Sequence, residues 1–249
     1  MRTLLSGLLI AVTLVAGTAA PAGAAQPFTP AEEKAVEEIV QDYLVENPEV
    51  IGKAIRALRD KREKARRAKA KEALAAHRDK LLNAHPVAGN PDGDVAVVEF
   101  FDYQCGYCKS AFPGVRKTVR RDGDVRWVLI DFPILGPVSR YAAKAALAAR
   151  EQDKYFALHQ ALMEHEGKLS KDAVMAEAEA VGLDVEQLKQ DMQADSIQRT
   201  IDSNLELAKA LDVTGTPAFV VGDTVAPGAV KPKALKKMIA RARENKQEQ

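Results

Sequence analysis

Two cysteines, three positions apart, constrain this chain more than any other feature. Cys105 and Cys108 are the only cysteines among its 249 residues. Two cysteines placed at random would show this spacing in about one case in 120. A disulfide that closes so short a loop restricts the unfolded chain little, so it would stabilise a fold poorly. The pair is therefore better explained by thiol chemistry than by structural cross-linking.

The segments around the cysteines predict where the thiols lie. Residues 96–101 form an apolar run interrupted by Glu99 and predict a buried strand, and 109–121 fit a helix bent or shifted at Pro113. The cysteines would then sit at a helix N-terminus, where free N–H groups and the helix dipole stabilise a thiolate. We expect Cys105 to be accessible and to attack disulfides, and Cys108 to be shielded within bonding reach as the resolving thiol.

The rest of this region predicts an α/β fold. A second strand is expected over 125–130, a helical block from about 139 to 211, a strand over 218–222, a short strand near 224–228 and a closing helix over 233–243. Strand–helix–strand units predict a sheet covered by helices. Trp127 is interpreted as packing. His159 and His165 are interpreted as packing or surface residues, because a spacing of six does not place them on one helix face as metal ligands.

Two further positions have competing interpretations. Glu99 is either a strand-end residue with its carboxylate in water or a half-buried carboxylate that moves protons near the thiols. Thr216-Pro217 is either an ordinary trans turn before a strand or a cis turn that exposes the backbone of residue 216 to an extended peptide. The residue pattern leaves both questions open.

The N-terminus has the pattern of a secretory signal peptide. Arg2 precedes an apolar run over 4–16, and small residues at 22–24 offer a cleavage site near Ala24. The apolar run is shorter than the roughly 20 residues that a membrane span needs. We therefore expect residues 1–24 to be removed and the protein to be exported to the periplasm.

Residues 25–85 predict a separate helical segment. A capping box at Thr29 and Glu32 opens one helix, and Asn47-Pro48 ends it and begins a second. Residues 60–80 are rich in interleaved charges and favour a solvated helical spacer, with His77 and His85 facing solvent. The net charge of +1 and the lack of aromatics in this spacer argue against nucleic-acid binding. The main domain begins at 86.

Two motifs closely resemble the DsbA-like thioredoxin family. They are residues 99–109 around the cysteines and 214–220 around Pro217, and the resemblance covers about 86–245. It implies a thioredoxin fold with a helical insertion at about 139–211. It also implies a reactive Cys105, a resolving Cys108, a proton-shuttling Glu99 and a cis Pro217, with Thr216, Pro217 and Tyr107 contacting the substrate.

The N-terminal helices resemble those of the ScsC branch, through residues 42–44 and 47–50. That resemblance implies a homo-oligomer, including trimers, formed through residues 29–60. Gly106-Tyr107 replaces the Pro-His dipeptide of DsbA oxidases, and Thr216 replaces their usual Val. Both departures favour an isomerase or reductase over a DsbA-like oxidase. The expected partners are exported proteins with thiols or disulfides and a membrane-borne redox partner.

Two other function classes stay open. A periplasmic copper-binding protein would use the two thiolates and a third soft ligand, for which Met163 and Met192 are the candidates. A holdase would grip client proteins with the apolar N-terminal face. We expect no cofactor and no resident metal. The sequence does not decide whether 60–80 form a rigid helix or a hinge.

Overall fold

The computed structural model describes residues 28–83 and 85–247, apart from the side chain of residue 67. The predicted signal peptide lies outside this part of the chain. The chain divides into two compact units, Met1–Arg59 and Asp60–Gln249, which we call the N-terminal and C-terminal units. None of the described helices is both long enough and apolar enough to cross a membrane.

The N-terminal unit is helical, as predicted. Helix α1 (Pro30–Glu46) begins at the capping box, where the Glu32 side chain accepts from the Thr29 N–H and the Thr29 hydroxyl accepts from the Glu32 N–H. Asn47 ends the helix and donates a side-chain hydrogen bond to the Tyr43 carbonyl. Helix α2 (Glu49–Ala76) starts here and continues into the C-terminal unit. No residue of α1 is buried.

The C-terminal unit is built on one mixed sheet with the strand order β1-β3-β2-β4-β5. Strands β2 (Val95–Phe101) and β3 (Val125–Asp131) are parallel, and the other neighbours are antiparallel. Strands β4 (Ala218–Val221) and β5 (Thr224–Pro227) complete one edge, and β1 (Val87–Gly89) forms the other. The α/β prediction and the four predicted strands are confirmed. Strand β1 was not predicted, because its three residues are too few to show a period.

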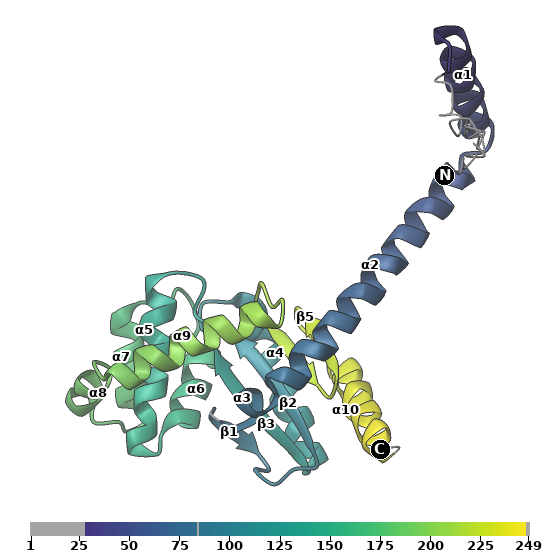
Figure 1. Ribbon diagram of the computed structural model, residues 1–249. Coiled ribbons are helices and arrows are strands. Elements are labelled where there is room, and N and C mark those ends of the chain that lie inside the picture. The colour runs from purple at the N-terminus through teal and green to yellow at the C-terminus, as the bar shows by residue number, and fades with distance from the viewer. Residues whose placement is uncertain (1–27, 84, 248–249) are drawn as a thin grey trace, which may run out of the picture. The chain divides into compact units, whose positions relative to one another are not determined.

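Helices cover both faces of the sheet (Figure 1). Their bounds are α3 (Arg78–Asn83), α4 (Gly106–Asp122), α5 (Pro137–Ala148), the 3-10 helix η1 (Ala149–Gln152), α6 (Tyr155–Glu164), α7 (Lys171–Ala180), α8 (Val185–Asp191), α9 (Asp195–Ala210) and α10 (Pro232–Gln247). Successive side chains of β2 point to opposite faces of the sheet. Val97 and Phe101 pack with α4 and the helical block on one face. Val98 and Phe100 pack with α9 on the other face. Glu99 faces the α4 side.

The end of the predicted spacer packs against the sheet. Leu74 of α2 and Leu81 of α3 are buried in the same cluster as Val98 and Phe100. His85 is also buried, and its Nε2 lies 2.9 Å from the Lys80 carbonyl oxygen. The predictions of a solvated spacer through residue 80 and of a solvent-facing His85 are therefore wrong. A few leucines among many charges carry too little periodicity to reveal a buried contact.

Candidate active site

The loop between β2 and α4 is fixed by one buried carboxylate. Asp102 Oδ1 accepts from the Gln104 N–H at 2.8 Å and from the Ser139 hydroxyl at 2.7 Å. Its Oδ2 accepts from the N–H groups of Ile134 and Leu135 at 2.9 and 3.0 Å. Four hydrogen bonds thus join the cysteine loop, the loop after β3 and the start of α5. These bonds fix the backbone immediately before Cys105 and Gly106.

Cys105 is the N-cap of α4, as the strand–helix pattern predicts. Its Sγ accepts from the Cys108 N–H at 3.4 Å, and its S–H donates to the Thr216 carbonyl at 3.3 Å. Both cysteines are free thiols. Cys105 is only 6% exposed, so the prediction of an accessible nucleophile is wrong for this arrangement, in which the Thr216 loop covers the sulfur.

The Thr216–Pro217 peptide bond is cis, as the family resemblance implies. It precedes β4, whose antiparallel partner β2 leads into the cysteine loop, and this pairing brings the two sequence motifs together. Tyr107, between the two cysteines, is 73% exposed and is the most solvent-exposed large apolar residue of the C-terminal unit. The structure therefore joins Cys105, Cys108, Thr216 and Pro217, with Tyr107 on the rim.

Glu99 of β2 is close enough to Cys108 for its charge to act on that thiol. It is buried, and the Trp127 indole N–H donates a hydrogen bond of 3.0 Å to its Oε2. Burial raises the pKa of Glu99 to about 8. Burial, together with the Cys105 thiol and the Glu99 charge, raises the pKa of Cys108 well above its usual range. The interpretation of Glu99 as a carboxylate in water is wrong, and so is the interpretation of Trp127 as packing alone.

A second buried polar cluster surrounds Asp131 and was not predicted from the sequence. The Tyr155 hydroxyl donates to Asp131 Oδ2 at 2.9 Å, and the Asn204 amide donates to the Asp131 carbonyl at 2.9 Å. The Tyr103 hydroxyl lies 3.1 Å from Nδ1 of His159. A signal was present, because Asp131 ends an apolar strand much as Glu99 interrupts one. Its partners lie 24 or more residues away and leave no local pattern.

The metal-ligand candidates of the helical block have packing or hydrogen-bonded positions. His159 is buried among aromatic rings, which confirms the packing interpretation, and desolvation lowers its pKa to about 3. His165 Nδ1 lies 2.8 Å from Glu177 Oε1. Met163 and Met192 are buried core residues. In the described part of the chain, no three His, Cys, Asp or Glu side chains are grouped so that they could hold a metal ion.

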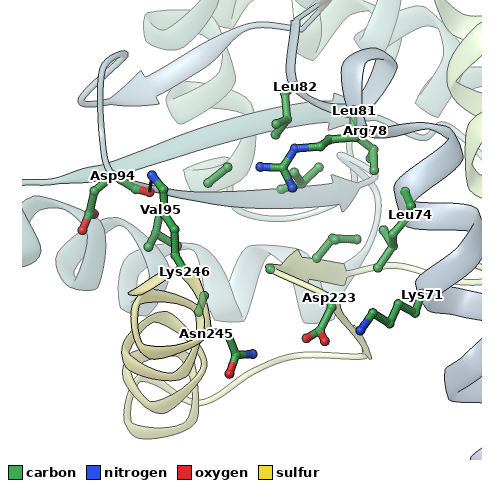
Figure 2. A pocket seen from close by; sticks show the side chains of 16 residues that line it. Lys71, Leu74, Arg78, Leu81, Leu82, Asp94, Val95, Asp223, Asn245 and Lys246 are labelled. Atoms are coloured by element: carbon green, nitrogen blue, oxygen red, sulfur yellow. Dashed lines mark hydrogen bonds between the residues drawn. The ribbon is translucent and has the colours of Figure 1, made fainter. Parts of the chain in front are cut away.

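A pocket of about 370 Å³ lies elsewhere in the C-terminal unit (Figure 2). Val95 and Ala96 at the start of β2, and Gly222 just after β4, belong to its lining. The cysteine loop follows the end of β2, and Pro217 precedes β4. Both motifs therefore lie at the ends of these strands that are far from the pocket. The thiol site is therefore separate from this pocket.

These features define a thioredoxin-fold protein with a dithiol at a helix N-terminus beside a cis-proline loop. Residues 96–240 match the DSBA-like thioredoxin domain family, and the chain belongs to that family. Residues 32–65 match the copper resistance protein ScsC N-terminal domain. The chain thus combines the two parts that the sequence resemblance indicated.

Solved structures show the same likeness. A thioredoxin-like oxidoreductase from Silicibacter pomeroyi is 48% identical, with a TM-score of 0.66 over 67% of this chain and 98% of that one. A linker-deletion mutant of ScsC from Proteus mirabilis is 31% identical, with a TM-score of 0.68 over 89% of this chain and 100% of that one. Among curated relatives, a Na(+)/H(+) antiporter NhaA 1 of Salinispora arenicola is 29% identical over 63% of this chain, but the match spans only 24% of that protein.

Proposed function

We propose that this protein is a periplasmic thiol–disulfide oxidoreductase that acts on exported proteins, with isomerase or reductase activity favoured over oxidase activity. The observation that carries the proposal is the position of Cys105. Its sulfur caps α4, accepts the Cys108 N–H and lies beside the Thr216 carbonyl. A helix N-terminus stabilises the thiolate that disulfide exchange requires.

The reaction follows from this geometry. The Cys105 thiolate attacks one sulfur of a client disulfide, forming a mixed disulfide and releasing the other client sulfur as a thiolate. During isomerisation that client thiolate attacks another client disulfide, and the client thiolate freed in this way attacks the mixed disulfide, which forms a new client disulfide and releases Cys105 as a thiolate. In reduction, Cys108 attacks the Cys105 sulfur, which releases the client as a dithiol and leaves a Cys105–Cys108 disulfide. A membrane-borne donor of reducing equivalents would restore the dithiol.

Glu99 is proposed to accept and return the Cys108 proton. Cys108 is fully buried and must lose its proton before it attacks, and the Glu99 charge acts on it. A carboxyl group with a pKa of about 8 exchanges protons near neutral pH. Thr216, Pro217 and Tyr107 are proposed to contact the client chain, because they surround the Cys105 sulfur or stand exposed beside it.

The isomerase direction rests on the N-terminal unit. Apolar side chains on α1 are exposed, namely Val36, Ile39, Val40 and Tyr43, and this unit overlaps the match to the ScsC N-terminal domain. We propose that the stripe packs against copies of itself and forms a homo-oligomer, including a trimer. Several dithiols in one particle would suit the repeated exchange that isomerisation needs.

Refolding of a scrambled-disulfide protein tests the function. The mature chain is compared with a version lacking residues 26–59, because a longer deletion would remove the buried Leu74 and Leu81. Activity that the deletion abolishes, and that Cys105→Ser also abolishes, supports an oligomeric isomerase. Rapid oxidation of a reduced client by both versions, without isomerisation, would instead identify a DsbA-like oxidase. No exchange of either kind would refute the proposal.

Self-association has its own test. Ile39→Lys places a charge on the exposed stripe of α1, and Gln41→Lys adds the same charge on the opposite side of the helix. We expect sedimentation velocity to show an oligomer for the native chain and for Gln41→Lys, but a monomer for Ile39→Lys. A native chain that is monomeric at all concentrations would contradict the proposed assembly.

A further inference from the structure

A buried acid that the proposed reaction does not use lies close to the cysteine loop. Asp131 ends β3, and its partner in the parallel register is Phe101, the last residue of β2. Its side chain is buried, and Oδ2 accepts the hydrogen bond from Tyr155. Oδ1 has no hydrogen-bond partner among the described residues. A carboxylate with one unpaired buried oxygen is costly, whereas a carboxylic acid is tolerated.

No lysine or arginine among the described residues pairs with the Asp131 carboxyl group. The groups that face it are the hydroxyls of Tyr155 and Tyr103 and the amide of Asn204, while the Asp102 carboxylate opposes its ionisation. His159 of α6 is neutral at neutral pH, and Glu99 lies on the same face of the adjacent strand. Burial raises the pKa of Asp131 to about 7, so its charge changes within the working range of a periplasmic protein.

Asp131 lies beside the segment that leads to the nucleophile. The register partner of Asp131, Phe101, lies four residues before Cys105, and the hydroxyl of the intervening Tyr103 lies 3.1 Å from His159 Nδ1. The neighbouring Phe132 N–H also bonds the Phe101 carbonyl at 2.8 Å, so the ends of β2 and β3 are tied together. A change of charge at Asp131 therefore acts on the segment that sets the Cys105 sulfur at the helix N-terminus.

We propose that Asp131 is a positioning residue for Cys105, which acts through the paired ends of β2 and β3 and whose ionisation lowers the reactivity of the Cys105 thiol. Ionisation releases the carboxyl proton to solvent and leaves a buried anion near the helix end. That anion opposes the field of the helix N-terminus, which otherwise stabilises the thiolate. This inference deepens the proposed function, since it rests on Cys105 being the nucleophile.

The test follows alkylation of Cys105 in the reduced, full mature chain as a function of pH. The Cys105 thiolate displaces iodide from iodoacetamide and forms a C–S bond, and mass spectrometry gives the rate between pH 5.5 and 8.5. Asp131→Asn keeps the shape of the side chain but cannot ionise. We expect its rate to match the native rate at pH 5.5 and to be about threefold to tenfold higher at pH 8, where the native chain carries the extra buried charge.

Two outcomes would overturn the proposal. Native and Asp131→Asn profiles that superimpose would show that the charge of Asp131 does not reach Cys105. Rates that differ by one constant factor at every pH would show a structural role alone. Glu99 is present in both proteins, so its own titration is common to both profiles and does not create the difference.

A second variant decides the question if Asp131→Asn does not fold. Tyr155→Phe removes the hydroxyl that stabilises the Asp131 anion, so the pKa of Asp131 should rise and the loss of reactivity should move to higher pH. Tyr141→Phe removes a hydroxyl from a half-buried tyrosine of α5 and should keep the native profile. A Tyr155→Phe profile identical to the native one would refute the coupling.

The alkylation readout is independent of the proposed activity. Iodoacetamide reports the Cys105 thiol without any client protein, redox partner or turnover. A chain that shows the predicted pH profile but exchanges no disulfides would refute the proposed function and leave the role of Asp131 intact. A chain that isomerises disulfides with superimposed alkylation profiles would refute only the role of Asp131.

Discussion

The two units of the chain use amphipathic helices in opposite ways. In α9 of the C-terminal unit, the apolar residues Ile201, Leu207 and Ala208 are buried against the rest of that unit. In α1 of the N-terminal unit, residues with the same helical spacing, such as Ile39 and Tyr43, are exposed. The pattern shows that a face can be covered, but it does not show what covers it. We propose that copies of the chain cover α1.

The contrast is sharpest within α2, because that helix belongs to both units. Leu58 is 48% exposed, whereas Leu74 is 7% exposed and packs with the sheet. We expect Leu74→Ala to lower the free energy of unfolding of the C-terminal unit by about 2–5 kcal/mol, because a buried leucine is replaced by a cavity. Leu58→Ala should change it by less than about 0.5 kcal/mol.

Urea unfolding of both variants, followed by Trp127 fluorescence, would measure this difference. Trp127 is the only tryptophan and lies on β3, so its signal reports the C-terminal unit. Measurement at several protein concentrations separates any effect of Leu58→Ala on association. Equal losses of stability in the two variants would contradict the assignment of Leu74 as buried and Leu58 as exposed.

Acid sensitivity should also separate the units. Within the described residues, every histidine lies in the C-terminal unit. Desolvation depresses the pKa of His159 to about 3 from an ordinary value near 6.5, so below pH 6.5 the unfolded chain binds a proton that the folded chain does not. Above pH 6.5 His159 is neutral in both the folded and the unfolded chain, so it does not make the free energy of unfolding depend on pH. Below pH 6.5 the His159 contribution lowers the free energy of unfolding by roughly 1.4 kcal/mol per pH unit.

The variant His159→Phe isolates this effect. Phenylalanine keeps an apolar ring among the surrounding aromatic side chains but cannot be protonated. Glu99 and Asp131 have raised pKa values and act in the opposite direction, so the useful quantity is the difference between the native chain and the variant. We expect this difference to shift in favour of the variant from pH 6.5 to 5, as measured by urea unfolding. A difference that is constant with pH would show that His159 is protonated in the folded state.

The sequence predicted the parts of the site that lie on single elements. The apolar run before Cys105 and the helix after it identified both thiols, and the family resemblance indicated Pro217. What it missed was contact between distant segments. Glu99 and Trp127 lie 28 residues apart, and Tyr103 and His159 lie 56 apart. A polar residue in an apolar strand signals that a partner exists. Only the folded chain shows which side chain that partner is.

The same limit applies to burial near element ends. Leu74 and Leu81 lie among charged residues, so the mean hydropathy of the surrounding segment is that of a polar segment. The sheet nevertheless covers both leucines. Strand β1 is too short to have a measurable period, yet it places His85 against the core by pairing with β3. Periodicity predicts which face of a long helix or strand is buried. It has no information about short segments whose burial is decided by their neighbours.

The two units also differ in their ion pairs, for which we expect the smallest effect on stability. Arg243 of α10 forms hydrogen bonds to both carboxylate oxygens of Asp94 and of Asp122, at 2.6 to 3.0 Å, and so joins α10 to the start of β2 and the end of α4. The Lys34–Glu38 pair of α1 is longer, at 3.7 Å, and both side chains are largely exposed. Geometry and partial burial should make the first contact the stronger one.

We expect Arg243→Met to lower the free energy of unfolding by about 1 kcal/mol, because two carboxylates lose their shared cation while the apolar stem of the side chain is kept. Lys34→Met should produce no measurable change in the unfolding of the C-terminal unit. Thermal unfolding in low salt and in 1 M salt provides the control, because screening should reduce the Arg243 effect. If Arg243→Met were as stable as the native chain in low salt, the closing helix would be held by Leu235 and Ile239 alone.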